Sequence, residues 1–184
     1  MKIPVYKTEG IVVGRFNSNE FDRLLVVYTR ERGKILVKAK SLRKKEAKMK
    51  ESLELFSHVY LTLAKGKNID TVAGVMLADG FPNLRRDLLS LSSAYYICEL
   101  LDKLIAGPEK DERIWELVLK AFTFLEEKPR NGRTIEKLIS RFEYNLLSFL
   151  GHRPEKQEKS YLHLLQYTCG CRIESALFLI PLLR

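Results

Sequence analysis

The sequence has 184 residues, of which 46% are hydrophobic and 30% are charged, and its formal net charge is +9. This composition allows a packed core and excludes a chain that is disordered along its whole length. The positive charge is uneven, because residues 1–80 carry 16 basic and 9 acidic side chains, whereas residues 81–184 carry 16 and 14. Such an asymmetry predicts a surface for nucleic acid or another polyanion on the first half.

The cysteine count and the lack of long apolar runs indicate a cytoplasmic protein. The three cysteines, Cys98, Cys169 and Cys171, are an odd number and favour a reducing compartment. The N-terminus has no signal-peptide pattern, and there is no run of about 18 apolar residues to predict a membrane span. Cys169 and Cys171 resemble half of a zinc site, but the spacing supplies no further ligands. We therefore expect inert thiols, with no metal and no cofactor.

Residues 1–80 predict a small β-barrel. Alternating apolar side chains and turn signals place strands over residues 7–15, 22–29, 34–40, 53–64 and 69–77. Five strands within about 70 residues, with the longest break after the third, are typical of a small closed barrel.

Residues 81–184 predict an α-helical bundle. Apolar residues recur every three or four positions over 84–105, 113–127 and 134–150, and two further helices are expected over 155–167 and 174–183. Asn83 and Thr134 are the expected N-terminal caps of the first and third helices. The predicted fold class is therefore α+β, with one domain over residues 1–80 and a second over residues 81–184.

The stretch from Lys34 to Lys50 has eight basic residues and one acid. Side chains alternate between the two faces of a strand, so Lys34, Lys38 and Lys40 share a face that continues into a basic loop. Such a track suits a polyphosphate backbone. The alternative is that these lysines are solvated surface, or that they protect a strand edge from aggregation.

Aromatic side chains offer base stacking beside this track. Phe56 and Tyr60 share a face of the predicted 53–64 strand, where they either stack bases or dock the helical half. The full set of candidate nucleic-acid-binding residues is Arg15, Lys34, Lys38, Lys40, Arg43, Lys44, Lys45, Lys48, Phe56, Tyr60, Lys65 and Lys67. The sequence has no nucleotide-binding loop, nucleophile elbow or metalloprotease motif, so we expect no catalytic residues and no enzyme.

A series of short motifs runs in order along the chain. They are TEGIVV at 8–13, EFDRLL at 20–25, TRERGK at 29–34, LELF at 53–56, AKG at 64–66, FP at 81–82 and RFE at 141–143. In this order and spacing, the motifs resemble the bacterial RecO family of recombination mediator and DNA repair proteins. The resemblance covers about residues 6–154.

The resemblance implies an N-terminal five-stranded OB-fold barrel followed by an α-helical bundle domain. It implies binding to single- and double-stranded DNA, strand annealing, and help in loading RecA onto DNA coated with single-strand-binding protein. The implied partners are RecR, single-strand-binding protein through its acidic tail, RecA and, in some bacteria, RecF. By the same resemblance, the DNA contacts include Arg15, Lys38, Lys40, Arg43, Lys44 and Lys45. Many members also carry a four-cysteine zinc module after the equivalent of residues 151–154, which this sequence lacks.

Two other functions fit the same residues. An RNA-binding OB-fold protein needs the same lysines, because a barrel and its cations do not distinguish the sugars, and competition between DNA and RNA oligomers separates these cases. A protein adaptor would carry its lysines only for solubility. It would bind no oligomer in about 50 mM salt but would still capture a partner protein.

Overall fold

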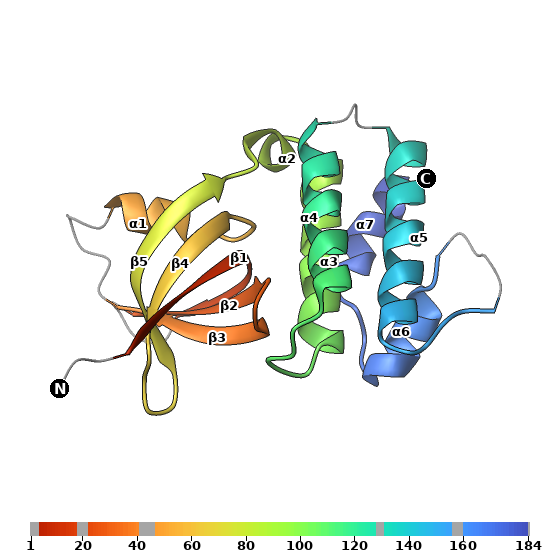
Figure 1. Cartoon of the computed structure of the whole chain (residues 1–184). Helices are drawn as coiled ribbons and strands as arrows, with labels where there is room; N and C mark the ends of the chain where they lie inside the picture. Colours follow the sequence, from red (N-terminus) through yellow and green to blue (C-terminus); the bar gives the residue numbers. More distant parts are fainter. Residues whose placement is uncertain (1–3, 18–21, 41–46, 128–130, 156–159, 184) are drawn as a thin grey trace. The chain divides into compact units, whose positions relative to one another are not determined.

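The computed structural model describes residues 4–17, 22–40, 47–127, 131–155 and 160–183 (Figure 1). The chain divides into two compact units. The first comprises Met1–Gly80 with Ala106–Asp111, and the second comprises Phe81–Ile105 with Glu112–Arg184. Within the described ranges, no helix is both long enough and apolar enough to cross a membrane.

The first unit is built on a five-stranded barrel. Its strands are β1 (Val5–Asn17), β2 (Arg23–Thr29), β3 (Gly33–Ala39), β4 (His58–Ala64) and β5 (Asp70–Asp79). Antiparallel pairs join β1 to β2, β2 to β3, β1 to β4 and β4 to β5. A short parallel pairing between β3 and β5 closes the ring in the order β1-β2-β3-β5-β4. The predicted five-stranded barrel of OB-fold type is thereby confirmed.

Most of the barrel core comes from every second residue of the strands, because alternate side chains face the interior. Its buried members are Val12, Leu25, Val27, Val37, Ala39, Leu53, Val59, Leu61, Leu63 and Val72. Some of the intervening residues are buried as well, such as Ile11 (0% exposed) and Tyr28 (1%), whereas Phe16 and Leu36 are exposed.

The predicted fourth strand begins too early. β4 starts at His58, and the residues before it form turns in which Phe56 has a positive φ of 74°. Val12 bonds to this segment through both of its backbone groups: its N–H donates to Ser57 (3.0 Å) and its C=O accepts from Phe56 (2.7 Å). The apolar side chains before β4 are therefore buried by a turn packed on β1, and not by strand alternation.

A short helix, α1 (Ala47–Ser52), forms where the sequence predicted a basic loop. Met49 from this helix packs against the barrel core, and α1 contacts β5. Met49 therefore anchors α1 to the barrel, and Leu53, just after the helix, is buried in the same core.

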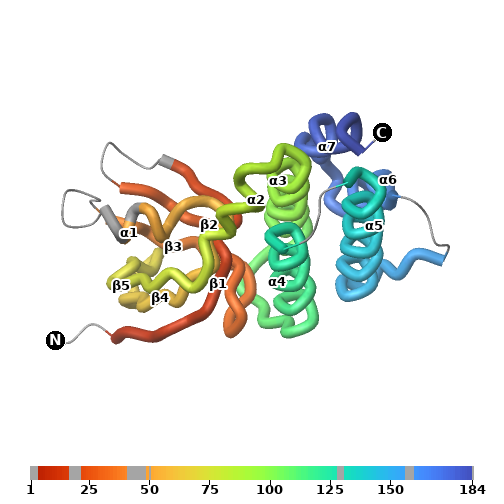
Figure 2. The backbone as a smooth tube through the Cα atoms, turned by 90° about the horizontal axis from the view of Figure 1, so that it is seen from above, coloured from red at the N-terminus to blue at the C-terminus, as the bar shows by residue number. Residues whose placement is uncertain are grey.

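In the described part of the second unit, all regular secondary structure is α-helical. It contains α2 (Pro82–Arg86), α3 (Leu88–Leu104), α4 (Glu112–Glu127), α5 (Gly132–Phe149), α6 (Leu162–Cys169) and α7 (Ala176–Leu183). α3 contacts all five of the other helices, and Figures 1 and 2 both show it running beside α4. The predicted helical bundle is confirmed, with α3 at its centre.

The caps differ from those predicted. Asp87 is extended (φ −108°, ψ 121°), which divides the predicted first helix into α2 and α3, and its carboxylate accepts the Ser90 N–H (2.8 Å) to cap α3. Asn83 does not cap α2; its side chain donates to Glu126 instead (2.8 Å). At α5 the cap is Asn131, not Thr134.

A buried carboxylate joins three segments of the helical unit. Glu143 on α5 accepts the Tyr96 hydroxyl from α3 (2.5 Å) and the Tyr161 N–H at the start of α6 (2.7 Å). Burial raises the pKa of Glu143 above its usual value, although its hydrogen bonds oppose this shift.

Candidate nucleic-acid interface

The outward face of β3 carries the predicted lysines. Val37 faces the core and is fully buried, whereas Leu36 is 43% exposed. Lys34 and Lys38 alternate with the core residues and are half-buried, and Lys40 is exposed just beyond the strand. The predicted alternation of this strand is therefore confirmed.

An aromatic ring lies in the same cross-strand row as Lys38. Leu24 in β2 pairs with both Lys38 in β3 and Phe16 in β1. Residues paired directly across a sheet project from the same face, and Phe16 is 54% exposed. A ring for base stacking and an ammonium group for phosphate thus share one surface. Phe16 is not among the predicted contacts, because the predicted first strand ends at residue 15.

The β4–β5 turn adds Lys65 and Lys67, which are both exposed. The Gly66 N–H donates to the Asp70 carboxylate (2.9 Å), which closes the turn. A Cβ at Gly66 would lie 2.0 Å from the Ile69 carbonyl oxygen, so this close approach requires glycine. Asp70 is the first residue of β5 and pairs with β3, which places the turn beside the lysine strand.

The turn is also fixed from β1. The Tyr6 hydroxyl donates to the Asp70 carboxylate (2.5 Å), and the Arg32 guanidinium lies 4.2 Å from the centre of the Tyr6 ring. Burial, with help from this hydrogen bond, raises the pKa of Tyr6 to about 12. The same bond is the main reason that the pKa of Asp70 lies below its usual value. Asp70 is therefore ionised at neutral pH and holds the turn in place.

Several cations of the barrel already have carboxylate partners. Arg15 and Arg23 each bind one carboxylate oxygen of Glu54, and Lys38 Nζ lies 2.7 Å from the Asp22 carboxylate. Two guanidinium groups on one carboxylate leave a positive charge in excess. Partly exposed ion pairs contribute only about 0.2–1 kcal/mol, so a phosphate can replace the protein carboxylate.

The predicted stacking pair does not belong to the lysine face. Phe56 is 1% exposed, so no base can stack on it, and that prediction is wrong. Tyr60 is 45% exposed, but its strand neighbours are Glu9 in β1 and Met76 in β5, and β4 does not pair with β3.

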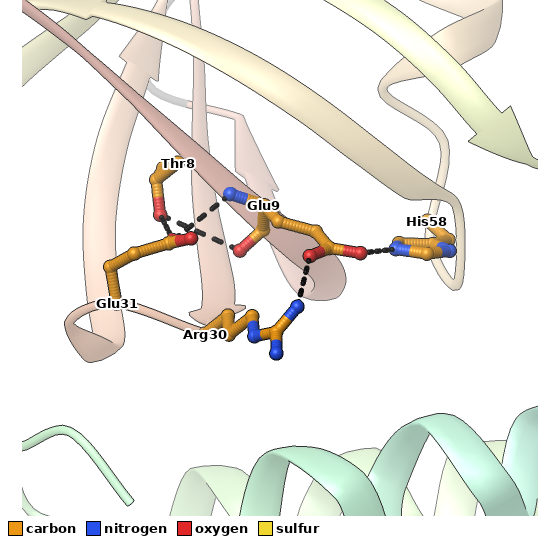
Figure 3. A network of polar contacts seen from close by, with 5 residues as sticks. All are labelled: Thr8, Glu9, Arg30, Glu31 and His58. Atoms are coloured by element: carbon orange, nitrogen blue, oxygen red, sulfur yellow. Dashed lines mark hydrogen bonds and ion pairs between the residues drawn. The ribbon is translucent and has the colours of Figure 1, made fainter. Parts of the chain in front are cut away.

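The surface around Tyr60 includes the carboxylates of Glu9 and Glu31, together with Lys7. Figure 3 shows the polar contacts of these two carboxylates. The Glu9 carboxylate lies 2.9 Å from His58 Nε2 and 3.4 Å from the Arg30 guanidinium. Glu31 accepts the backbone N–H of Glu9 (3.1 Å), which brings a second carboxylate to the same surface. Carboxylates repel phosphate, so we place the candidate interface elsewhere on the barrel. It consists of Phe16, Lys34, Lys38, Lys40 and the β4–β5 turn with Lys65 and Lys67, and we call it the lysine face.

Four of the predicted contacts are not located. Arg43, Lys44 and Lys45 lie outside the described residues, and for Lys48 the structure gives only its backbone, in α1. Their roles stay predictions. Among the residues that the structure describes, no group of three or more His, Cys, Asp or Glu side chains could hold a metal ion.

The helical unit has a groove of about 690 Å³ between α4 and α5. Its apolar lining includes Leu117, Phe124, Leu138, Phe142 and Phe149, and its charged lining consists of three basic side chains, Arg113, Lys120 and Arg141, and two acidic ones, Glu112 and Glu116. The Arg113 guanidinium lies 5.0 Å from the centre of the Phe149 ring, and Lys120 is bound to Glu116 (2.6 Å). An apolar lining with cations beside it suits a peptide that combines apolar and acidic groups.

Comparison with known families accounts for both units. The family model described as Recombination protein O N terminal matches residues 1–81, and the model described as Recombination protein O C terminal matches residues 85–178. The chain belongs to the RecO family. The resemblance inferred from the motifs is thereby confirmed.

Individual members of the RecO family are similar over most of this chain. The DNA repair protein RecO of Symbiobacterium thermophilum is 35% identical over 82% of this chain and 58% of its own length. The proteins of the same name from Roseiflexus sp. and Dehalococcoides mccartyi are each 34% identical over 86% of this chain, and over 54% and 61% of their own lengths. The chain therefore spans a little over half the length of these curated relatives.

Proposed function

We propose that this RecO family chain is a non-enzymatic DNA-binding mediator of recombinational repair. It binds single- and double-stranded DNA, anneals complementary strands and helps to load RecA onto DNA coated with single-strand-binding protein. Its proposed partners are RecR, single-strand-binding protein, RecA and, in some bacteria, RecF. The observation that carries the proposal is the lysine face, where Lys38 and the Phe16 ring share a cross-strand row and the exposed Lys65 and Lys67 lie in the turn before β5, the strand that pairs with β3.

The physical basis of binding is counterion release. Each lysine that contacts a phosphate frees a condensed cation, which drives binding without reference to base sequence. Annealing follows because a cationic surface lowers the repulsion between two strands. Contacts to the backbone leave the base edges free to pair.

The test compares single-stranded DNA binding by Lys65→Ala/Lys67→Ala with binding by the intact chain. Loss of two phosphate contacts should weaken affinity about 25-fold in 0.1 M salt, because each contact changes the log-log salt slope by about 0.7. The matched control is Arg133→Ala/Lys137→Ala, which removes two exposed cations from α5. Equal affinities for the turn variant and the control would refute the assignment of the lysine face.

The same assay separates the alternative functions. Equal or tighter binding of an RNA oligomer of the same sequence would favour an RNA-binding protein. Absence of oligomer binding in about 50 mM salt, with retained capture of RecR or single-strand-binding protein, would favour an adaptor.

We place the acidic tail of single-strand-binding protein in the α4–α5 groove. Apolar side chains would fill the space between the two helices, and Arg141 would face a tail carboxylate. Arg141→Glu should weaken binding of the tail peptide at least tenfold, as measured by fluorescence anisotropy. Arg133→Glu is the matched control, because helical spacing puts Arg133 away from the groove side of α5. Equal effects of the two variants would contradict this placement.

A further inference from the structure

Two cysteine sulfurs meet at the end of α6. The helix ends at Cys169, Gly170 adopts a left-handed conformation (φ 63°), and the chain turns so that the Cys171 thiol donates to Cys169 Sγ at 2.9 Å. Both side chains are half-buried, whereas the third cysteine, Cys98, is buried in α3. The turn thus forms a dithiol that reagents can reach.

Contacts on both sides hold this turn in place. The Gln166 side chain in α6 accepts the Ile173 N–H (3.2 Å), which draws the chain after the dithiol back to the helix. Further on, the Glu99 carboxylate of α3 accepts the backbone N–H groups of Glu174 (3.0 Å) and Ser175 (2.8 Å). The short separation of the sulfurs is therefore built into the connection between α6 and α7.

The separation fits a disulfide better than a metal. A disulfide bond of about 2.05 Å needs less than about 1 Å of further approach. Two sulfurs on one tetrahedral zinc ion, with Zn–S bonds of about 2.3 Å, would lie about 3.8 Å apart. Within the described part of the chain, no third metal-binding side chain completes a site with them.

We propose that Cys169 and Cys171 are a reversible redox site, in which a small-molecule disulfide such as oxidised glutathione converts the dithiol into an intramolecular disulfide. One cysteine thiolate attacks the glutathione disulfide, forms a mixed disulfide and releases one glutathione thiolate. The second cysteine thiolate attacks the cysteine sulfur of this mixed disulfide, forms the Cys169–Cys171 bond and releases the second glutathione as a thiolate. Two electrons pass from the dithiol to the oxidant, and the two thiol protons end on the released glutathiones.

The experiment titrates the full chain with glutathione buffers of increasing oxidised fraction, followed by alkylation and trypsin. Residues 160–172 form one tryptic peptide that contains both cysteines and excludes Cys98. We expect the doubly alkylated peptide to be replaced, as the buffer becomes oxidising, by an unalkylated peptide two hydrogens lighter than the free dithiol, and to return after reduction. Cys98→Ser should behave as the intact chain, whereas Cys169→Ser and Cys171→Ser should each abolish the transition.

A synthetic peptide of residues 160–172 shows whether the fold contributes. Because the folded turn holds the two sulfurs together, the equilibrium constant for disulfide formation should be at least tenfold larger in the full chain than in the peptide. This factor corresponds to a difference of about 30 mV in the reduction potential of this two-electron couple. The proposal is overturned if both cysteines remain alkylated at every ratio, or if only mixed glutathione adducts form. Equal constants for the chain and the peptide would also overturn it.

Discussion

Tyr96→Phe tests the buried carboxylate of Glu143. Both side chains are buried, and the Tyr96 hydroxyl donates to the carboxylate at 2.5 Å. A hydrogen bond to a charged group contributes about 1.5–3 kcal/mol, and the carboxylate cannot replace this donor with bulk water. We expect the variant to lose about 2 kcal/mol of unfolding free energy near neutral pH.

The loss should depend on pH in a defined direction. Burial raises the pKa of Glu143, and removal of a donor raises it further. An acid whose pKa is raised in the folded state stabilises the fold, and this contribution to the free energy of unfolding is complete below its unfolded pKa of about 4.3. That contribution is lost as the pH rises through the folded pKa. The difference in unfolding free energy between Tyr96→Phe and the intact chain should therefore be smaller at pH 5 than at pH 8.

Urea denaturation at both pH values measures this difference, and comparison with the intact chain cancels the other titrating groups. Tyr95→Phe is the matched control, because Tyr95 is the next residue of α3 and is 49% exposed, so its loss should stay within about 0.5 kcal/mol. A loss for Tyr96→Phe that is the same at pH 5 and pH 8, or no larger than that of the control, would refute the reasoning.

Two further predictions concern the barrel. Phe16→Ala should weaken single-stranded DNA binding by about 1–3 kcal/mol while the salt slope stays constant, because a stacking ring carries no charge; a changed slope in anisotropy titrations would contradict stacking. Glu54→Gln should tighten DNA binding and steepen the salt slope, since it releases two guanidinium groups from a carboxylate; unchanged binding would mean that Arg15 and Arg23 do not contact DNA.

Local patterns predicted most of the barrel. The predicted alternation of Lys34 and Lys38 with Val37 is correct, because successive side chains of a strand point to opposite faces of the sheet. The same pattern failed over residues 53–57, where the apolar residues are buried by a turn. The sequence carried a signal of this failure, because Ser57 interrupts the alternation at a core position.

Features that depend on pairing between distant segments were beyond the sequence. Phe16 joins the lysine face only through the register of β1 on β2 and of β2 on β3. Base stacking by Tyr60 beside the lysines was one of two alternatives for this residue, but the strand order puts β5 between β4 and β3. In the helical unit, Asp87 sits in a continuous apolar pattern, and its role as a cap follows from a backbone conformation that the pattern does not encode.

The most direct test of the account is the salt dependence of single-stranded DNA binding by the intact chain. With about five phosphate contacts, the slope of log K against log salt should be about −3.5, and Arg43→Ala/Lys44→Ala/Lys45→Ala should reduce its magnitude by about 2. A slope near zero, or no binding in about 50 mM salt, would contradict the claim that fixed cations on the barrel hold nucleic acid by counterion release.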